Sequence, residues 1–447
     1  MATATENTSR GVSNALAHEP MGGFQVMVVL ISILLNALDG FDVLAITFAA
    51  PGISEDWAIS RSALGVVISS GLAGMAAGSI VLSPIADRFG RRPTIIICLL
   101  LMTVGMFLTA TASSITMLCV YRIVTGLGIG GLIPSITAVS AEFSNEKRRD
   151  LAVSAMTIGF PIGGLLGSYL SAELIDMGGW RAIFHAGGFI TAAFLPLVWF
   201  GVPESLEFLA TKGGAASLGK INAILKRMGH KPVPEAHAAA PAQKSADPRE
   251  LFGPEFRVLT LLLISAYFLH IMTFYFYSGW LPKILTDAGF TTSTALNTAA
   301  IMNIGGIIGG VAIGWVTPYF GLKRLAVISM AGTSVTMALF ALVTTDLPLQ
   351  RIVAFILGVF MFGGIVGLYA FLARAFPARL RVTGCGLAIA IGRGGGIIGP
   401  VLGGVLLDAG LRAGSVLMVV GVAAAFGAVF LLPTRIAEAK DSLSKPQ

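Results

Sequence analysis

Long apolar segments, each about as long as a helix that crosses a bilayer, most constrain how this chain of 447 residues can fold. Such a helix needs roughly 20 mainly apolar residues. Twelve segments bounded by charged residues, Pro or Gly meet this requirement: 24–48, 62–84, 93–112, 115–141, 151–174, 181–202, 257–281, 295–319, 323–344, 348–373, 383–407 and 412–433. Only 12% of the residues are charged, against about 25% in a typical soluble protein. The sequence therefore predicts an all-α integral membrane protein.

The longest polar segment divides the twelve spans into two groups of six. Spans four and ten also share a pattern, YRIV at 121–124 and QRIV at 350–353, each followed by glycines and basic residues. Internal repeats of this kind build transporters whose central site lies at the repeat interface. We therefore predict two six-helix bundles. The predicted parts are a tail 1–23, a bundle 24–202, a central loop 203–256, a second bundle 257–433 and a tail 434–447.

Lys and Arg are distributed unequally between the two sides of the predicted membrane. If the N-terminus is cytoplasmic, 23 of the 30 basic residues fall on the inner side and five on the outer side. The positive-inside rule then places both termini in the cytoplasm. The net charge of +7 is explained by topology, so we expect no nucleic-acid partner, and we expect a functional monomer.

Two acidic residues lie inside the first span, at Asp39 and Asp42. Residues three apart share one helix face, and two carboxylates on an apolar face are not expected to be ionised together. Arg122 lies in the fourth span at a similar depth and could pair with one of them, which would link protonation to conformation. The alternatives are a solvated helix end for the acids and an Arg122 satisfied by backbone carbonyls. We predict that Asp39, Asp42 and Arg122 couple protons to transport.

A second group of candidate residues lies in the C-terminal half. Arg393 falls near the middle of span eleven among glycines, and a guanidinium binds carboxylates through two hydrogen bonds. Span seven combines His270 with aromatic residues that can stack on a planar ring. We predict that substrate binds to Arg393, Arg122, His270, Tyr267, Phe274 and Asn303. The alternatives are a fixed charge or helix-packing role for Arg393 and lipid contact for the aromatic residues.

The loop that ends the second span reads SPIADRFGRR at 83–92. Asp87 at a helix C-terminus opposes the helix dipole, so it requires a cation or the N-terminus of a neighbouring helix. We predict a conformational latch formed by Asp87, Arg88, Gly90, Arg91, Arg92, Glu142 and Arg149. The alternative is that the arginines only orient the chain in the membrane.

The same loop resembles the signature of the major facilitator superfamily, with Ser83 where glycine is usual. Together with Asp39-Gly40-Phe41-Asp42, Arg122 and Gly392-Arg393, it resembles the aromatic acid:proton symporters of that superfamily. This resemblance implies bacterial uptake of benzoate, hydroxybenzoates, gentisate and related acids. It also implies proton coupling at Asp39 and Asp42, and substrate binding or coupling at Arg122 and Arg393.

We therefore expect a proton-coupled importer of small aromatic carboxylates that works by alternating access. The alternatives are an exporter of drugs or organic anions in the same superfamily and a membrane sensor that transports nothing. The exporter signature Gly-Pro-x-x-Gly-Gly is only partly matched at 159–164, in the half where an exporter would carry it. No nucleophile–base pair or metal cluster is recognisable, so we expect no enzyme activity, no metal and no cofactor besides the proton gradient.

Overall fold

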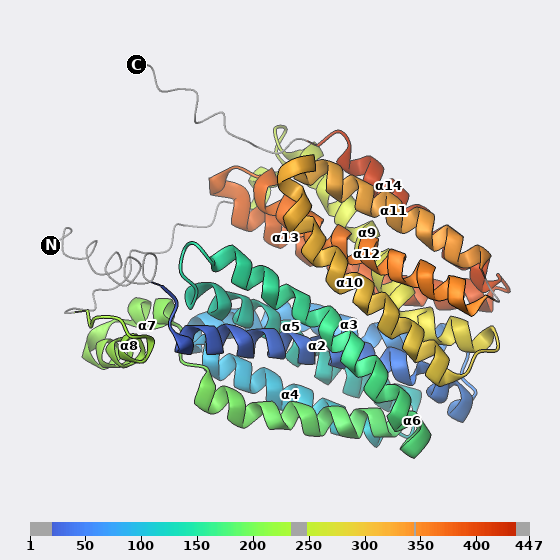
Figure 1. The fold of residues 1–447 in the computed structure, drawn as a ribbon, viewed down its shortest axis with the longest axis horizontal. Helices are drawn as coiled ribbons and strands as arrows, with labels where there is room; N and C mark the ends of the chain where they lie inside the picture. Colours follow the sequence, from blue (N-terminus) through green and yellow to red (C-terminus); the bar gives the residue numbers. More distant parts are fainter. Residues whose placement is uncertain (1–19, 234–247, 344–345, 435–447) are drawn as a thin grey trace. The chain divides into compact units, whose positions relative to one another are not determined.

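The computed structural model describes residues 20–233, 248–343 and 346–434, in which every regular element is a helix (Figure 1). The long helices are α2 (Gly23–Trp57), α3 (Arg61–Phe89), α4 (Arg91–Ala110), α5 (Ile115–Glu142), α6 (Arg149–Gly201), α9 (Arg257–Asp287), α10 (Thr292–Phe320), α11 (Leu322–Leu342), α12 (Leu347–Ala375), α13 (Ala378–Asp408) and α14 (Ala413–Leu431). The predicted tails lie almost entirely outside the described residues, as does part of the predicted central loop.

All of the predicted spans correspond to helices. Eleven helices in the described ranges are long and apolar enough to cross a membrane. The helix α6 contains two of the predicted spans, and the backbone leaves the helical conformation between them at Gly178 and Gly179. Gly179 has a φ of 66°, which a residue without a Cβ adopts readily. The twelve predicted spans are thus confirmed, with spans five and six joined by a glycine kink.

Three short helices lie within the described part of the predicted central loop. They are α7 (Leu206–Lys212), α8 (Gly214–Met228) and the 3-10 helix η1 (Pro248–Phe252). The Ser205 side chain caps α7 by accepting a hydrogen bond from the Phe208 N–H, as serine often does at this position. The helix α8 ends at Gly229 in the left-handed conformation, a common helix C-terminus. Its buried residues, among them Ile221, Ile224 and Leu225, lie on one face, so α8 is amphipathic.

The helices divide into two compact units, each described by itself here. The first unit contains residues 20–43, Gly74–Gly163 and 184–233, and the second contains Leu44–Ala73, Gly164–Ile183 and the described residues from 248 onward. The helices α4 and α5 pack together in the first unit. In the second unit α9 packs on α13 and α14, and α12 packs on α10 and α11. One boundary between the units falls within the predicted central loop, and the segments Leu44–Ala73 and Gly164–Ile183 of the predicted first bundle belong to the second unit.

Glycines let neighbouring helices approach closely within these units. A Cβ at Gly163 would overlap the carbonyl of Ala37, and one at Gly305 would overlap the carbonyl of Phe355. Small residues at helix contacts are typical of proteins that pack in lipid, where close backbone approach replaces the hydrophobic effect. The high glycine content, 55 of 447 residues, therefore serves helix packing.

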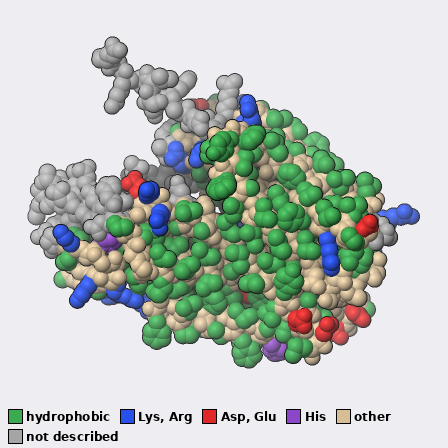
Figure 2. All heavy atoms as spheres, in the orientation of Figure 1, with side chains coloured by type: hydrophobic (Ala, Val, Ile, Leu, Met, Phe, Trp, Pro, Cys, Tyr) green, Lys and Arg blue, Asp and Glu red, His purple; other side chains and the backbone are tan. Residues whose placement is uncertain are grey.

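The surface carries many large apolar side chains that would be buried in a soluble protein. Examples are Trp315 and Tyr319, with exposed fractions of 83% and 85%, and Ile80 at 71%. Figure 2 shows a face covered mainly by hydrophobic side chains, and Lys and Arg gather at the end where α7 and α8 lie. This surface is suited to contact with lipid.

Candidate functional site

Two acidic side chains and one arginine lie buried together in the first unit. Asp39 and Asp42 on α2 are completely buried, and the exposed fraction of Arg122 on α5 is 1%. Thr191 Oγ1 lies 3.4 Å from Asp42 Oδ2, and Asp42 Oδ1 accepts no hydrogen bond from any described residue. Charged groups are costly to bury in an apolar bundle and mark functional sites in membrane proteins. The structure thus brings the predicted coupling residues into one cluster.

Arg122 contacts Asp42 through the main chain. Its Nη2 atom donates a hydrogen bond of 2.9 Å to the Asp42 carbonyl oxygen, and Nη1 lies 3.6 Å from Met106 Sδ. The guanidinium carbon also lies 5.8 Å from the centroid of the Phe184 ring, within the range of a cation–π interaction. In this conformation Arg122 donates its hydrogen bond to the Asp42 carbonyl and not to the carboxylate, although the two charges act on each other.

Close helix packing fixes the position of the acidic segment. A Cβ at Gly40, between the two acids, would overlap the carbonyl of Phe160 on α6. Asn36, one turn earlier, donates a hydrogen bond of 2.7 Å from Nδ2 to the carbonyl of Met156, also on α6. The acids are thus held on a helix whose neighbour leaves little space for water around them.

The second unit contains the predicted substrate-binding residues other than Arg122. On α9, the Tyr267 hydroxyl lies 3.0 Å from the Tyr369 hydroxyl, and the Phe274 ring meets the Phe362 ring edge to face at a centroid distance of 5.1 Å. The side chain of Arg393 on α13 is half-buried, and its charge acts on the Tyr267 phenol. The structure therefore places Arg393 beside the aromatic residues of α9, as a carboxylate-binding role requires.

Three buried polar atoms on α9 and α10 accept or donate no hydrogen bond within the described part of the chain. They are Nδ1 of His270, Oδ1 of Asn303 and the hydroxyl of Tyr277. His270 Nε2 lies 2.9 Å from the Met361 carbonyl, and Asn303 Nδ2 donates to the Ala299 carbonyl at 2.9 Å. Buried polar atoms without partners are rare in native structures, so these atoms are candidates for hydrogen bonds to a ligand. The sequence analysis did not select Tyr277, because nothing in the surrounding sequence distinguishes it from the neighbouring aromatic residues.

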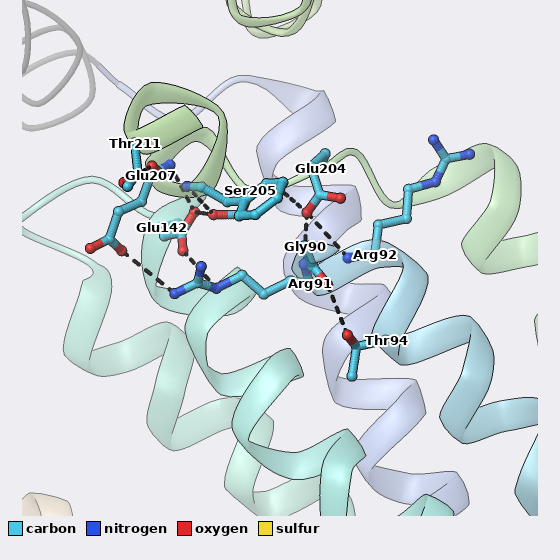
Figure 3. Close-up of polar contacts among 10 residues, drawn as sticks. Gly90, Arg91, Arg92, Thr94, Glu142, Glu204, Ser205, Glu207 and Thr211 are labelled. Carbon is cyan, nitrogen blue, oxygen red and sulfur yellow. Dashed lines mark hydrogen bonds and ion pairs between the residues drawn. The ribbon is translucent and has the colours of Figure 1, made fainter. Parts of the chain in front are cut away.

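The predicted latch is partly assembled within the first unit (Figure 3). Arg91 Nε lies 3.4 Å from Glu142 Oε1, and both side chains are largely buried. Glu142 Oε2 accepts a hydrogen bond of 2.6 Å from Ser205 Oγ, and Arg91 Nη2 lies 3.8 Å from Glu207 Oε2. Arg91 therefore joins the end of α5 to the start of α7.

Glu204, which the sequence analysis did not single out, takes the position at a helix N-terminus that was predicted for Asp87. Its Oε1 accepts hydrogen bonds from the N–H groups of Arg91 and Arg92 at the start of α4, at 2.8 and 3.3 Å. Gly90 makes the turn before α4 with a φ of 109°. Asp87 is exposed, with no hydrogen bond or ion pair to any described residue, so its predicted partner is not found. Arg88 and Arg149 are also exposed. The sequence signal that could have identified Glu204 is the position of its carboxylate, just before the helices of the central loop.

A further polar contact in the second unit joins α3 to α13. Asp408 accepts hydrogen bonds from the N–H groups of Arg61 and Ser62, at 3.1 and 2.8 Å, and so caps the start of α3. Further along α3, Ser69 Oγ donates a hydrogen bond of 2.7 Å to the carbonyl of Ile397. We call the contact of Arg61, Ser62 and Ser69 with Asp408 and Ile397 the α3–α13 clasp. Sequence reasoning missed it because its partners are more than 300 residues apart.

Twelve apolar spans and buried ionisable side chains define a polytopic helical membrane transporter. The sequence profile of the Major Facilitator Superfamily matches residues 32–318 and 263–447. The chain belongs to this superfamily, as its sequence motifs predicted, and is a transporter and not an enzyme.

Relatives and solved structures agree with this membership. The chain is 31% identical to the gallate transporter of Pseudomonas putida, over 94% of each chain. It is 30% identical to the 4-hydroxybenzoate transporter PcaK of Acinetobacter baylyi, over 90% of each chain. The inward-open structure of the xylose transporter XylE from Escherichia coli superposes with a TM-score of 0.73 at 18% identity, covering 93% of this chain and 98% of that chain. The resemblance to aromatic acid transporters is confirmed by sequence, and the fold by structure.

Proposed function

We propose that the chain imports small aromatic carboxylates together with protons across a bacterial inner membrane. The observation that carries this proposal is the buried cluster of Asp39, Asp42 and Arg122 in an otherwise apolar bundle. Its relatives named for gallate and 4-hydroxybenzoate transport support the substrate class. The unequal distribution of basic residues supports cytoplasmic termini.

Asp42 is one candidate for the proton carrier. An ionised carboxylate in a dry site costs much free energy unless it is paired. Asp42 Oδ1 has no hydrogen-bond partner among the described residues, and Thr191 is the one side chain that reaches Oδ2. Binding of a proton removes the charge, and release of the proton restores it. This change in charge beside Arg122 is the event that would favour one conformation of α2 and α5 over another.

The substrate carboxylate would bind to Arg393. A guanidinium can donate two parallel hydrogen bonds to a carboxylate, and Gly392 beside Arg393 packs closely against the Tyr267 ring. The ring would lie against the aromatic residues of α9, represented by Tyr267 and Phe274. Ring hydroxyls could donate hydrogen bonds to His270 Nδ1 or Asn303 Oδ1, the two buried acceptors without described partners.

The α3–α13 clasp supports an alternating-access mechanism. With cytoplasmic termini, the Arg61 end of α3 faces the outside, so the clasp would close that side. A hydrogen-bonded helix cap can break and form again as the conformation changes. We infer that the clasp opens when substrate enters from outside, and that the chain works as a monomer without a cofactor other than the proton gradient.

Uptake into proteoliposomes with an imposed pH gradient, acidic outside, tests the proposal. Labelled benzoate, 4-hydroxybenzoate, gentisate and gallate are offered separately. We expect concentrative uptake of at least one acid that a protonophore abolishes. Accumulation with the gradient reversed would indicate export instead, and binding without counterflow exchange would indicate a sensor.

A further inference from the structure

A groove of about 800 Å³ lies in the first unit, away from the buried acids. Its walls are the start of α4, the end of α6 and the pair α7 and α8. The apolar lining includes Ile96 and Ile97 of α4, Trp199 of α6 and Ile224 of α8. Trp199 has an exposed fraction of 56%, so the groove opens onto the apolar surface of the helices.

Four basic side chains line the same groove, namely Arg92, Lys212, Lys220 and Arg227. Arg92 donates one hydrogen bond to the Trp199 carbonyl and lies over the Trp199 ring at 5.3 Å, while its buried Nε has no hydrogen-bond partner among the described residues. Lys212, Lys220 and Arg227 are exposed. The groove thus combines an apolar wall with donors that suit a phosphate.

Glu204 also lines the groove, but its single negative charge does not cancel the charge of the four basic residues. Glu204 Oε1 accepts hydrogen bonds from the N–H groups of Arg91, Arg92 and Ser205. Its carboxylate therefore stabilises the N-terminus of α4. An anion in the groove would meet four cations and one carboxylate, whose Oε1 atom already accepts hydrogen bonds from backbone N–H groups.

The position of the groove indicates a membrane component as its ligand. The amphipathic helix α8 has its basic residues next to the ends of spans that carry exposed apolar side chains, such as Phe200 at 76%. Amphipathic helices with Lys and Arg on the polar face lie at membrane surfaces and attract anionic lipids. We propose that this groove binds an anionic phospholipid of the cytoplasmic leaflet, with the phosphate at the four basic residues and the acyl chains along α4 and α6.

The bound lipid would also hold the latch in place. The helix α7, one wall of the groove, begins at Ser205, whose hydroxyl donates to Glu142 of the Arg91–Glu142 pair. A lipid that bridges α4 to α7 and α8 would therefore stabilise this arrangement of the latch (Figure 3).

Native mass spectrometry of the full chain released from micelles tests the proposal, with phosphatidylglycerol and phosphatidylcholine of equal chain length as probes. We expect the wild-type chain to retain phosphatidylglycerol about tenfold more strongly, because the four basic residues attract its net negative charge, which the zwitterionic phosphatidylcholine lacks. The triple variant Lys212→Gln, Lys220→Gln, Arg227→Gln should lose most of this preference. The matched control Lys147→Gln, Lys226→Gln, Lys231→Gln removes three exposed charges that do not line the groove, and should keep it.

Equal retention of the two lipids by the wild-type chain would overturn the proposal without need of any variant. Equal loss in the control variant would also overturn it, because the effect would then be one of total charge. The measurement uses neither substrate nor a proton gradient, so its outcome is independent of the proposed transport activity.

Discussion

Arg122 is hydrogen-bonded to the main-chain carbonyl of Asp42 at 2.9 Å, and the Asp42 carboxylate is left to Thr191. The charge of Asp42 and the anchoring of Arg122 therefore depend on different atoms of one residue. A substitution that removes the titratable group keeps the carbonyl, so the electrostatic role of Asp42 can be tested without loss of this contact between α2 and α5.

Replacing Asp42 with Asn should abolish proton-driven accumulation. The amide is close in size to the carboxyl but cannot bind and release a proton at these pH values, and the bond from Arg122 to the carbonyl remains. We expect exchange of labelled for unlabelled substrate to continue, because exchange needs no net proton movement. The measurement compares pH-driven uptake with counterflow in the same proteoliposomes.

Thr191→Val is the control for the site's polarity, since it removes the hydrogen bond to Asp42 Oδ2 and leaves the carboxyl. It should retain accumulation. Undiminished accumulation by the Asp42→Asn variant would exclude Asp42 as the proton carrier and leave Asp39.

Replacing Arg393 with Lys should weaken substrate binding although the charge is kept. An ammonium cannot form the two parallel hydrogen bonds that a guanidinium gives a carboxylate. A hydrogen bond to a charged group contributes about 1.5–3 kcal/mol, which corresponds to a rise of roughly tenfold to a hundredfold in the dissociation constant. A scintillation proximity assay with labelled 4-hydroxybenzoate measures this dissociation constant, and Arg324→Lys is the control. An unchanged constant would remove Arg393 from the binding site.

Asn303→Leu should discriminate between substrates with and without a ring hydroxyl. The Asn303 Nδ2 bond goes to the carbonyl of Ala299 in its own helix, so little structural hydrogen bonding is lost. We expect transport of 4-hydroxybenzoate to fall while transport of benzoate persists, measured as kcat/KM for each acid. Equal losses for the two acids would indicate a packing defect and not a contact with the hydroxyl.

Gly163→Ala should destabilise the fold, because its Cβ would overlap the carbonyl of Ala37 on α2. Overpacking typically costs about 1–3 kcal/mol. Gly314→Ala is the matched control, since a Cβ there meets no atom within 4 Å and alanine is favoured in a helix by about 1 kcal/mol. Thermal unfolding in detergent should show a lower midpoint for the first variant and an equal or higher midpoint for the second. The reverse order would contradict the packing of α2 on α6.

Asp408→Ala should expose the buried face of α3, because it removes the acceptor for the N–H groups of Arg61 and Ser62. A reporter Ser70→Cys, placed where the side chain is 6% exposed, should then react several-fold faster with a water-soluble thiol reagent, in a background with serine at the three native cysteines. Asp346→Ala, which removes the cap of α12, is the control and should leave the rate unchanged. Equal labelling rates for the Asp408 variant and its parent would exclude the clasp as a closing contact.

The number and extent of the membrane spans could be predicted from the sequence because the apolar length needed to cross a bilayer is a local property of the chain. The spacing of Asp39 and Asp42 likewise determined that both acids share a helix face. The Asp87 loop, together with the other motifs, identified the superfamily. In each case the relevant information lies within a few helical turns, so no knowledge of the partners was needed.

Only the tertiary structure decided which atoms meet. It showed that Arg122 binds a carbonyl of α2, that Glu204 and not Asp87 caps α4, and that Asp408 caps α3. These contacts depend on how closely the helices approach and on the directions of the side chains. Glycines far apart in the chain together determine how closely the helices can approach. The sequence thus determined where the costly charges lie in the membrane, and the packing decided their partners, because a buried polar group takes whichever partner the neighbouring backbone brings within reach.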